Sequence, residues 1–84
     1  MTIKLALYST SACHLCELAA ELLDAVPATL ASWHEIEISE DENLLARYAT
    51  RIPVVRREDS NAELGWPFDA TQLQAFLVEG RSEK

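Results

Sequence analysis

The sequence predicts a single α/β domain in which a four-stranded mixed sheet is flanked by three helices. Short apolar runs of strand length alternate with longer amphipathic stretches, which is typical of strand-helix-strand units. Two late strand-like runs are separated by a short turn, so they must pair antiparallel, whereas a crossover helix requires a parallel pair. With 84 residues, the chain has room for one domain with a modest core.

The chain opens with an apolar run at residues 3–8 (IKLALY), which is typical of a central strand covered on both faces. The turn that follows (STSA) is rich in residues that cap helix N-termini. A first helix should then begin near Cys13 and end before Pro27. Its apolar residues, spaced as an amphipathic helix requires, are Leu15, Leu18, Ala19, Leu22, Leu23 and Val26.

Residues 33–38 (WHEIEI) alternate in polarity, which predicts a half-exposed strand at an edge of the sheet. His34 has the same phase as the two isoleucines, so we expect it to be buried. Ser39 and Glu42 have the spacing of a capping box for a second helix. That helix should end near Thr50, because the proline of the following IPVV stretch disfavours helical geometry at the residue before it.

Two short strand-like runs, residues 53–58 (PVVRRE) and 62–66 (AELGW), flank the turn-forming DSN and predict a hairpin. Asp69 and Gln72 form a cap-like pair ahead of a third helix over residues 70–80, which should stop at its terminal glycine. The buried residues of this helix should be Leu73, Phe76 and Leu77.

Charge and hydropathy argue against a nucleic-acid partner and a membrane partner. The chain carries 14 acidic and 7 basic residues, and the basic ones form no stripe that could neutralise a phosphate backbone, so we expect no nucleic-acid partner. The N-terminal apolar run is shorter than that of a signal peptide, and no segment reaches the roughly 18 apolar residues of a membrane span. We therefore expect a cytoplasmic protein without a membrane partner. The domain should cover residues 1–80, followed by a charged tail at 81–84.

Cys13 and Cys16 are the only cysteines in the chain, and their C-x-x-C spacing fits redox chemistry, a metal site or a structural disulfide. In a reducing cytoplasm the first two are favoured over a structural disulfide. A closed zinc site needs four ligands, and beyond these two thiols only His14 or His34 could add a nitrogen. We therefore favour redox chemistry and expect no metal.

The helical phase makes the two thiols unequal. Cys13 should be exposed at the helix N-terminus, where unpaired N–H groups and the helix dipole stabilise a thiolate, while Cys16 should be partly buried one turn on. Cys13 is then the attacking thiol, and Cys16 resolves the mixed disulfide. His14 either favours the Cys13 thiolate as an imidazolium or is a solvated first-turn residue, and Glu17 would act against the thiolate.

Three features of the chain resemble the glutaredoxins of the thioredoxin superfamily. They are a YS strand end followed by a C-x-x-C helix, the later stretch TRIPVV, and a glycine-containing final strand. The similarity is greatest to the small bacterial glutaredoxin-like proteins. It implies a thioredoxin-like fold of the glutaredoxin type. It also implies that Pro53 is cis and faces the thiols, and that Ile52 offers its backbone to the substrate.

Two departures from the glutaredoxin pattern concern substrate binding. Many glutaredoxins carry a basic residue, which meets a carboxylate of glutathione, at the position that corresponds to Thr10. The glycines and acidic residues that tend to follow the last strand are replaced by LGWPFD, in which Trp66 and Phe68 are core or pocket-wall residues, with core favoured. Arg51 could supply the missing charge, although arginines at a helix end are more often solvated or paired with its carbonyls.

The residues and the resemblance together predict a thiol-disulfide oxidoreductase that reduces protein disulfides or glutathione mixed disulfides. The predicted site combines Cys13, Cys16, Pro53 and His14 as catalytic residues with Thr10, Ile52 and Arg51 as substrate-binding residues. A thioredoxin-fold binding module without turnover is the alternative, and a cysteine-histidine metal site is a more remote one. We expect no bound cofactor, glutathione as a candidate co-substrate, and a monomer.

Overall fold

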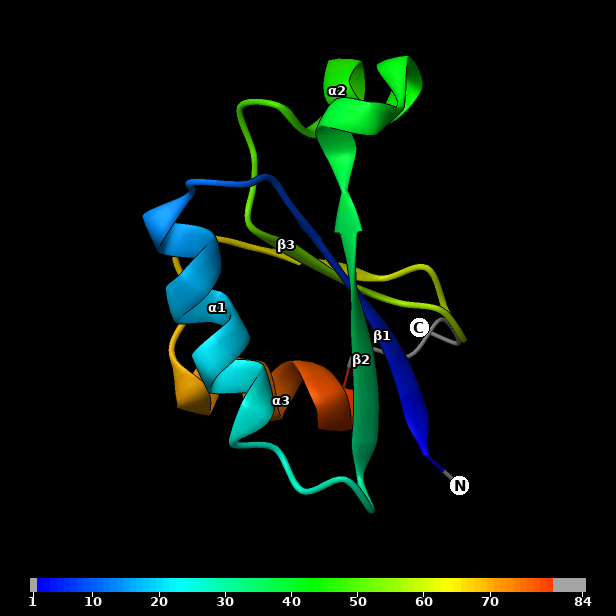
Figure 1. Cartoon of the computed structure of the whole chain (residues 1–84). Helices are drawn as coiled ribbons and strands as arrows, with labels where there is room; N and C mark the ends of the chain where they lie inside the picture. Colours follow the sequence, from blue (N-terminus) through cyan, green and yellow to red (C-terminus); the bar gives the residue numbers. More distant parts are fainter. Residues whose placement is uncertain (1, 80–84) are drawn as a thin grey trace.

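The computed structural model describes residues 2–79, which form an α/β fold with the predicted order of strands and helices (Figure 1). The elements in chain order are β1 (Ile3–Ser9), α1 (His14–Asp24), β2 (Ala31–Glu37), the short 3-10 helix η1 (Ile38–Glu40), α2 (Glu42–Tyr48), β3 (Val54–Arg57), β4 (Glu63–Gly65) and α3 (Ala70–Glu79). The predicted fold class, a four-stranded mixed sheet with three helices, is confirmed. The predicted stop at Gly80 and the tail at 81–84 lie outside the described residues.

The four strands form one sheet in the order β2-β1-β3-β4. β1 pairs in parallel with β2 and antiparallel with β3, and β4 completes an antiparallel hairpin with β3. β1 is central and its residues 5–9 are all buried, as the apolar run predicts, while β2 lies at an edge of the sheet. Since β1 leads directly into the Cys13 loop, the thiol pair lies at one end of the sheet.

Each face of the sheet has its own core cluster. The face covered by α1 and α3 buries Leu5, Leu7, Ala19, Leu23, Ala31, Val55, Phe68, Leu73 and Leu77. The face covered by α2 buries Ala6, Tyr8, Ile38, Tyr48 and Val54. Figure 1 shows α1 and α3 close together and α2 at the far end of the sheet. Neighbouring residues of β1 therefore contribute to opposite clusters, because successive side chains of a strand point to opposite faces.

The aromatic residues after β4 differ in burial. Phe68 is only 4% exposed and belongs to the cluster under α1 and α3, so the core assignment is correct for this residue. Trp66 is half-buried and packs edge-on against Phe68, with ring centroids 5.0 Å apart. Such an edge-to-face pair contributes about 0.5–1.5 kcal/mol beyond the area that it buries.

One predicted helix cap is confirmed and one is wrong. At the start of α3, the Gln72 N–H donates to Asp69 Oδ1 (2.8 Å) and the Asp69 N–H donates to Gln72 Oε1 (3.0 Å), which completes the predicted box. At α2 the N-cap is Asp41, whose Oδ1 accepts the Asn43 and Leu44 N–H groups. Ser39 does not cap α2, because residues 38–40 form their own turn, η1.

His34 is exposed rather than buried. Its side chain is 58% exposed, and its Nε2 lies 3.6 Å from Glu58 Oε2. The predicted phase is correct, since Ile36 and Ile38 pack into the cluster under α2 on the same face. However, α2 covers only the end of this edge strand where the isoleucines lie, and His34 is further back along it.

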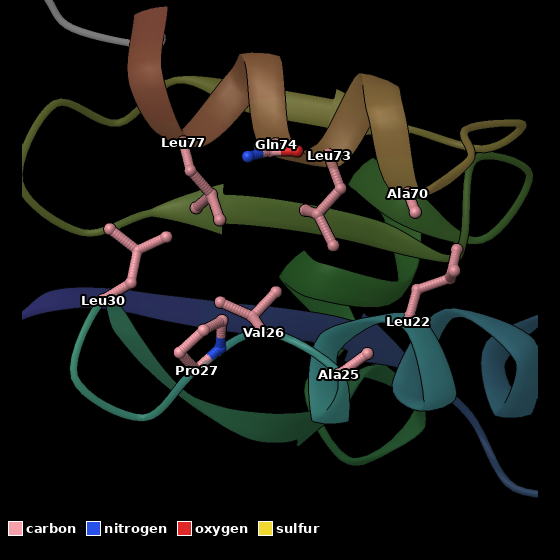
Figure 2. Close-up of a pocket in the computed structure, with 9 residues that line it drawn as sticks. All are labelled: Leu22, Ala25, Val26, Pro27, Leu30, Ala70, Leu73, Gln74 and Leu77. Atoms are coloured by element: carbon pink, nitrogen blue, oxygen red, sulfur yellow. The ribbon is translucent and has the colours of Figure 1, made fainter.

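An apolar groove of about 180 Å³ lies between the C-terminal end of α1, the loop that follows it and α3 (Figure 2). Its lining residues are Leu22, Ala25, Val26, Pro27, Leu30, Ala70, Leu73, Gln74 and Leu77. In Figure 2, Leu73 and Leu77 of α3 point toward the loop and the end of α1. Neither cysteine lines this groove, so it is separate from the thiol pair. Within residues 2–79, no helix is long and apolar enough to cross a membrane.

Candidate redox site

Cys13 and Cys16 form a disulfide at the start of α1, with their Cα atoms 5.2 Å apart. Cys13 is the N-cap residue of the helix and has an extended backbone (φ −106°, ψ 106°), so it lies just outside the first turn. Its side chain is half-buried, whereas Cys16 is only 3% exposed within the helix. The predicted difference in burial between the two cysteines is therefore confirmed, although Cys13 is less exposed than expected.

The sulfur of Cys13 occupies the place of a helix-capping oxygen. The Cys16 N–H donates to Cys13 Sγ at 3.2 Å, and the Glu17 N–H donates to the Cys13 carbonyl at 3.1 Å. A negative charge at this position is stabilised by the unpaired N–H groups and the dipole of the helix. The geometry is therefore suited to holding a Cys13 thiolate once the disulfide is reduced.

His14 lies between the cysteines but faces a carboxylate. Its side chain is 79% exposed, and its Nδ1 lies 3.8 Å from Glu17 Oε1. The exposure and the nearby carboxylate favour the alternative of a solvated first-turn residue over an imidazolium that supports the thiolate.

The loop that carries Cys13 is tied to the end of β2 by Glu37. Glu37 Oε1 accepts the Ser11 N–H (3.0 Å), and its Oε2 accepts both the Ser39 N–H (3.1 Å) and the Ser39 hydroxyl (2.8 Å). The pKa of Glu37 is lowered, first by a hydrogen bond from the Thr10 hydroxyl and then by those from Ser39. Ala12 adopts a left-handed φ of 58°, a conformation that an alanine rarely takes. The hydrogen bonds that Glu37 accepts from Ser11 and Thr10 come from this turn and help to hold it in place.

A pocket of about 220 Å³ opens directly beside the disulfide. Its lining residues are Thr10, Ser11, Ala12, Cys13, Cys16, Glu17, Ala20 and Glu35. Glu35 projects from β2 and accepts a hydrogen bond of 2.5 Å from the hydroxyl of Ser9, which is itself 1% exposed. Neither Glu35 nor Glu37 was predicted as a site residue from the sequence. Their alternation in β2 placed them on one face of the strand but did not indicate that this face adjoins the thiols.

The Ile52-Pro53 peptide bond is cis, as the resemblance implied, and Pro53 is buried directly before β3. The register pairs Val54 with Tyr8, so this turn lies at the end of β1 from which the Cys13 loop departs. The Ile52 N–H donates to the Tyr48 carbonyl at 3.1 Å, so this backbone donor is already engaged within the fold. A second cis bond, Trp66-Pro67, was not anticipated.

Arg51 is engaged by a carboxylate that the sequence analysis did not consider. Its Nη2 lies 2.8 Å from Glu63 Oε1, and its guanidinium lies over the Tyr48 ring at 5.1 Å from the centroid. Glu63 Oε2 also accepts the Tyr48 hydroxyl at 2.5 Å. Burial acts to raise the pKa of Glu63, but the bonds from Tyr48 and Arg51 together leave it lowered. Of the three predicted substrate-binding residues, only Thr10 lines the pocket beside the disulfide.

Metal ligands do not gather around the thiols in the part of the chain that the structure describes. Residues 2–79 contain no group of three or more His, Cys, Asp or Glu side chains that could hold a metal ion. His34, one of the two histidines considered as a ligand, lies instead beside Glu58. The described residues thus add no third ligand to the two thiols.

Comparison with known proteins identifies a matching family and similar solved structures. Residues 4–78 match the family model of the Glutaredoxin-like domain (DUF836). The chain is 38% identical to the Northeast Structural Genomics target protein XcR50 from X. campestris; its X-ray structure has a TM-score of 0.76, over 88% of this chain and 95% of that one. The solution structure of XcR50 has a TM-score of 0.73, over 88% and 91% of the two chains. A search of curated proteins found no match.

Proposed function

This chain belongs to the Glutaredoxin-like domain (DUF836) family, and from that premise we propose that it reduces protein disulfides or glutathione mixed disulfides through Cys13 and Cys16. The observation that carries the proposal is the disulfide at the N-terminus of α1, where Cys13 Sγ accepts the Cys16 N–H. A thiol at a helix N-terminus, next to a buried second thiol, is an arrangement suited to thiol-disulfide exchange.

The reaction begins with both cysteines reduced. The Cys13 thiolate attacks one sulfur of the substrate disulfide, a bond forms between that sulfur and Cys13 Sγ, and the other substrate sulfur leaves as a thiolate that takes up a proton. The Cys16 thiol then loses its proton and attacks Cys13 Sγ, which releases the second substrate sulfur. Two electrons pass to the substrate, and the protein ends as the Cys13-Cys16 disulfide.

The burial of Cys16 supports this order of steps. At 3% exposure, Cys16 is poorly accessible to a disulfide in solution, whereas it lies one helical turn from Cys13. Its reaction is therefore intramolecular, and the short distance raises its effective concentration. An external thiol, either glutathione or a reductase, must return the disulfide to the reduced form.

The remaining predicted residues have supporting roles in this proposal. Pro53 and the carbonyl of Ile52 border the substrate backbone, Thr10 contacts the substrate group nearest to Cys13, and His14 has at most a weak effect on the thiolate. Arg51 can meet an anionic substrate only by giving up part of its contact with Glu63. The protein is proposed to act in the cytoplasm as a monomer without a bound cofactor.

A redox titration of the wild-type protein and turnover assays of single-cysteine variants test the proposal. The wild-type protein should show a two-electron couple within the cytoplasmic potential range of about −220 to −320 mV. Cys13→Ser should abolish all turnover. Cys16→Ser should lose activity on protein disulfides and keep activity on glutathione mixed disulfides. A wild-type protein that forms the disulfide but turns over neither substrate would favour the binding module instead.

A further inference from the structure

Two carboxylates line the thiol pocket, and a third is bonded to the loop that carries Cys13. Glu17 and Glu35 line the pocket that also contains Cys13 and Cys16, although one comes from α1 and the other from β2. Glu37, two residues beyond Glu35, is bonded to the loop that carries Cys13. A substrate disulfide that reaches Cys13 must therefore pass close to these charges.

Two of these carboxylates are held in place rather than free to turn away. Glu35 is fixed by the buried hydroxyl of Ser9, and Glu37 is fixed by Thr10, Ser11 and Ser39. The hydrogen bonds lower the pKa of Glu37, so this side chain stays ionised at neutral pH. A charge in a fixed position beside a concave surface acts on an approaching molecule more strongly than a mobile one does.

The described cations near this end of the fold are mostly engaged elsewhere. Arg51 is paired with Glu63, and Arg56 donates to the Tyr8 hydroxyl at 3.3 Å. Arg47 is exposed in the last turn of α2. His14 is the basic side chain next to Cys13, and it already faces Glu17. The side-chain charge around the pocket is therefore negative, whereas the N-terminus of α1 adds a positive partial charge at the sulfurs themselves.

We propose that the dithiol reacts faster with disulfides whose neighbouring groups are positively charged, and more slowly with anionic disulfides such as those of glutathione. The inference rests on the proposed function and specifies its substrate class. Attraction raises the local concentration of a cationic disulfide and repulsion lowers that of an anionic one. With three carboxylates in or beside the pocket, the rate constants of the two kinds should differ by about tenfold at low ionic strength.

Three small disulfides of similar size and different charge test this proposal. Cystamine carries two ammonium groups, bis(2-hydroxyethyl) disulfide is neutral, and 3,3′-dithiodipropionate carries two carboxylates. The second-order rate constant for oxidation of the reduced protein is measured with each one by quenching and thiol counting. Each rate constant is divided by the rate constant for the reaction of dithiothreitol with the same disulfide. This division removes the intrinsic reactivity of that disulfide. The normalised ratio of cystamine to dithiodipropionate should be about ten at low salt and approach one near 1 M salt, where the Debye length is about 3 Å.

Matched variants separate the local charges from the net charge of the protein. Glu35→Gln should lower the ratio about two- to threefold. Glu58→Gln removes the same charge beside His34, at the opposite end of β1, and should leave the ratio unchanged. Circular dichroism confirms that both variants fold.

Each outcome has a defined meaning. A ratio near one for the wild type at low salt, or an equal decrease for both variants, would overturn the inference and leave the proposed function intact. A reduced protein that reacts with none of the three disulfides would refute the proposed function itself, and the inference with it.

Discussion

Arg57 is a buried arginine on which the packing of α3 depends, and its replacement should destabilise the whole domain. The residue is 3% exposed in β3. Its Nε and Nη2 bind the two oxygens of Asp59 at 3.0 and 2.7 Å, and its Nη1 binds the carbonyls of Leu77 at 2.7 Å and Phe76 at 3.3 Å. These carbonyls belong to the last turns of α3, where a helix lacks internal donors. The guanidinium therefore caps the helix that closes one face of the sheet.

Arg57→Met keeps most of the length of the side chain and removes all four of these hydrogen bonds. Each bond from a charged donor contributes about 1.5–3 kcal/mol, and the longer bond to Phe76 contributes least. Asp59 is 52% exposed and can bind water instead, so most of the loss comes from the α3 carbonyls. The free energy of unfolding should fall by about 3–4 kcal/mol, a large part of the roughly 5–10 kcal/mol available to a small domain.

Urea denaturation followed by circular dichroism measures this loss. With a slope near 1 kcal/mol per molar urea, the midpoint should move down by about 3 M. Asp59→Asn is the matched control, since it leaves the carbonyl bonds in place and should cost no more than about 1 kcal/mol. A cost below about 1 kcal/mol for Arg57→Met, or equal costs for the two variants, would refute the argument that Arg57 caps α3.

Three further predictions concern the site and its surroundings. The lowered pKa of Glu37 means that its stabilising effect is present above the ordinary glutamate pKa of about 4.3 and is lost as the pH falls below it. Thermal melts from pH 7 to pH 3 should therefore show a smaller acid-induced loss for Glu37→Gln than for the wild type, and an equal loss would contradict this. Tyr48→Phe removes a hydrogen bond to Glu63 and should raise the pKa of that carboxyl, measurable by NMR titration, with a loss of about 1 kcal/mol in urea unfolding. His34→Ala should change the free energy of unfolding by less than about 0.5 kcal/mol, because the pair with Glu58 is exposed; a larger loss would mean that His34 is buried in solution.

The features that sequence reasoning predicted correctly depend on neighbours along the chain. A period of two or 3.6 identifies a strand or a helix from its own residues, and the Asp69-Gln72 cap needs only three residues of separation. The unequal burial of Cys13 and Cys16 follows from the same helical phase. Even the wrong cap at Ser39 was a local error, since Asp41 lies two residues away and competes for the same helix start.

By itself, the sequence determined the order of the elements, the central strand and the two unequal thiols, because each of these is encoded in the spacing of adjacent side chains. Only the tertiary structure decided what faces those thiols. Ser9 meets Glu35 and Ser11 meets Glu37 across 26 residues of chain, and Arg57 reaches Leu77 across 20. Alternation in a strand indicates which face a side chain occupies. It does not indicate which other segment of the chain covers that face. The acidic pocket beside Cys13 exists because parallel pairing with β1 brings β2 alongside it.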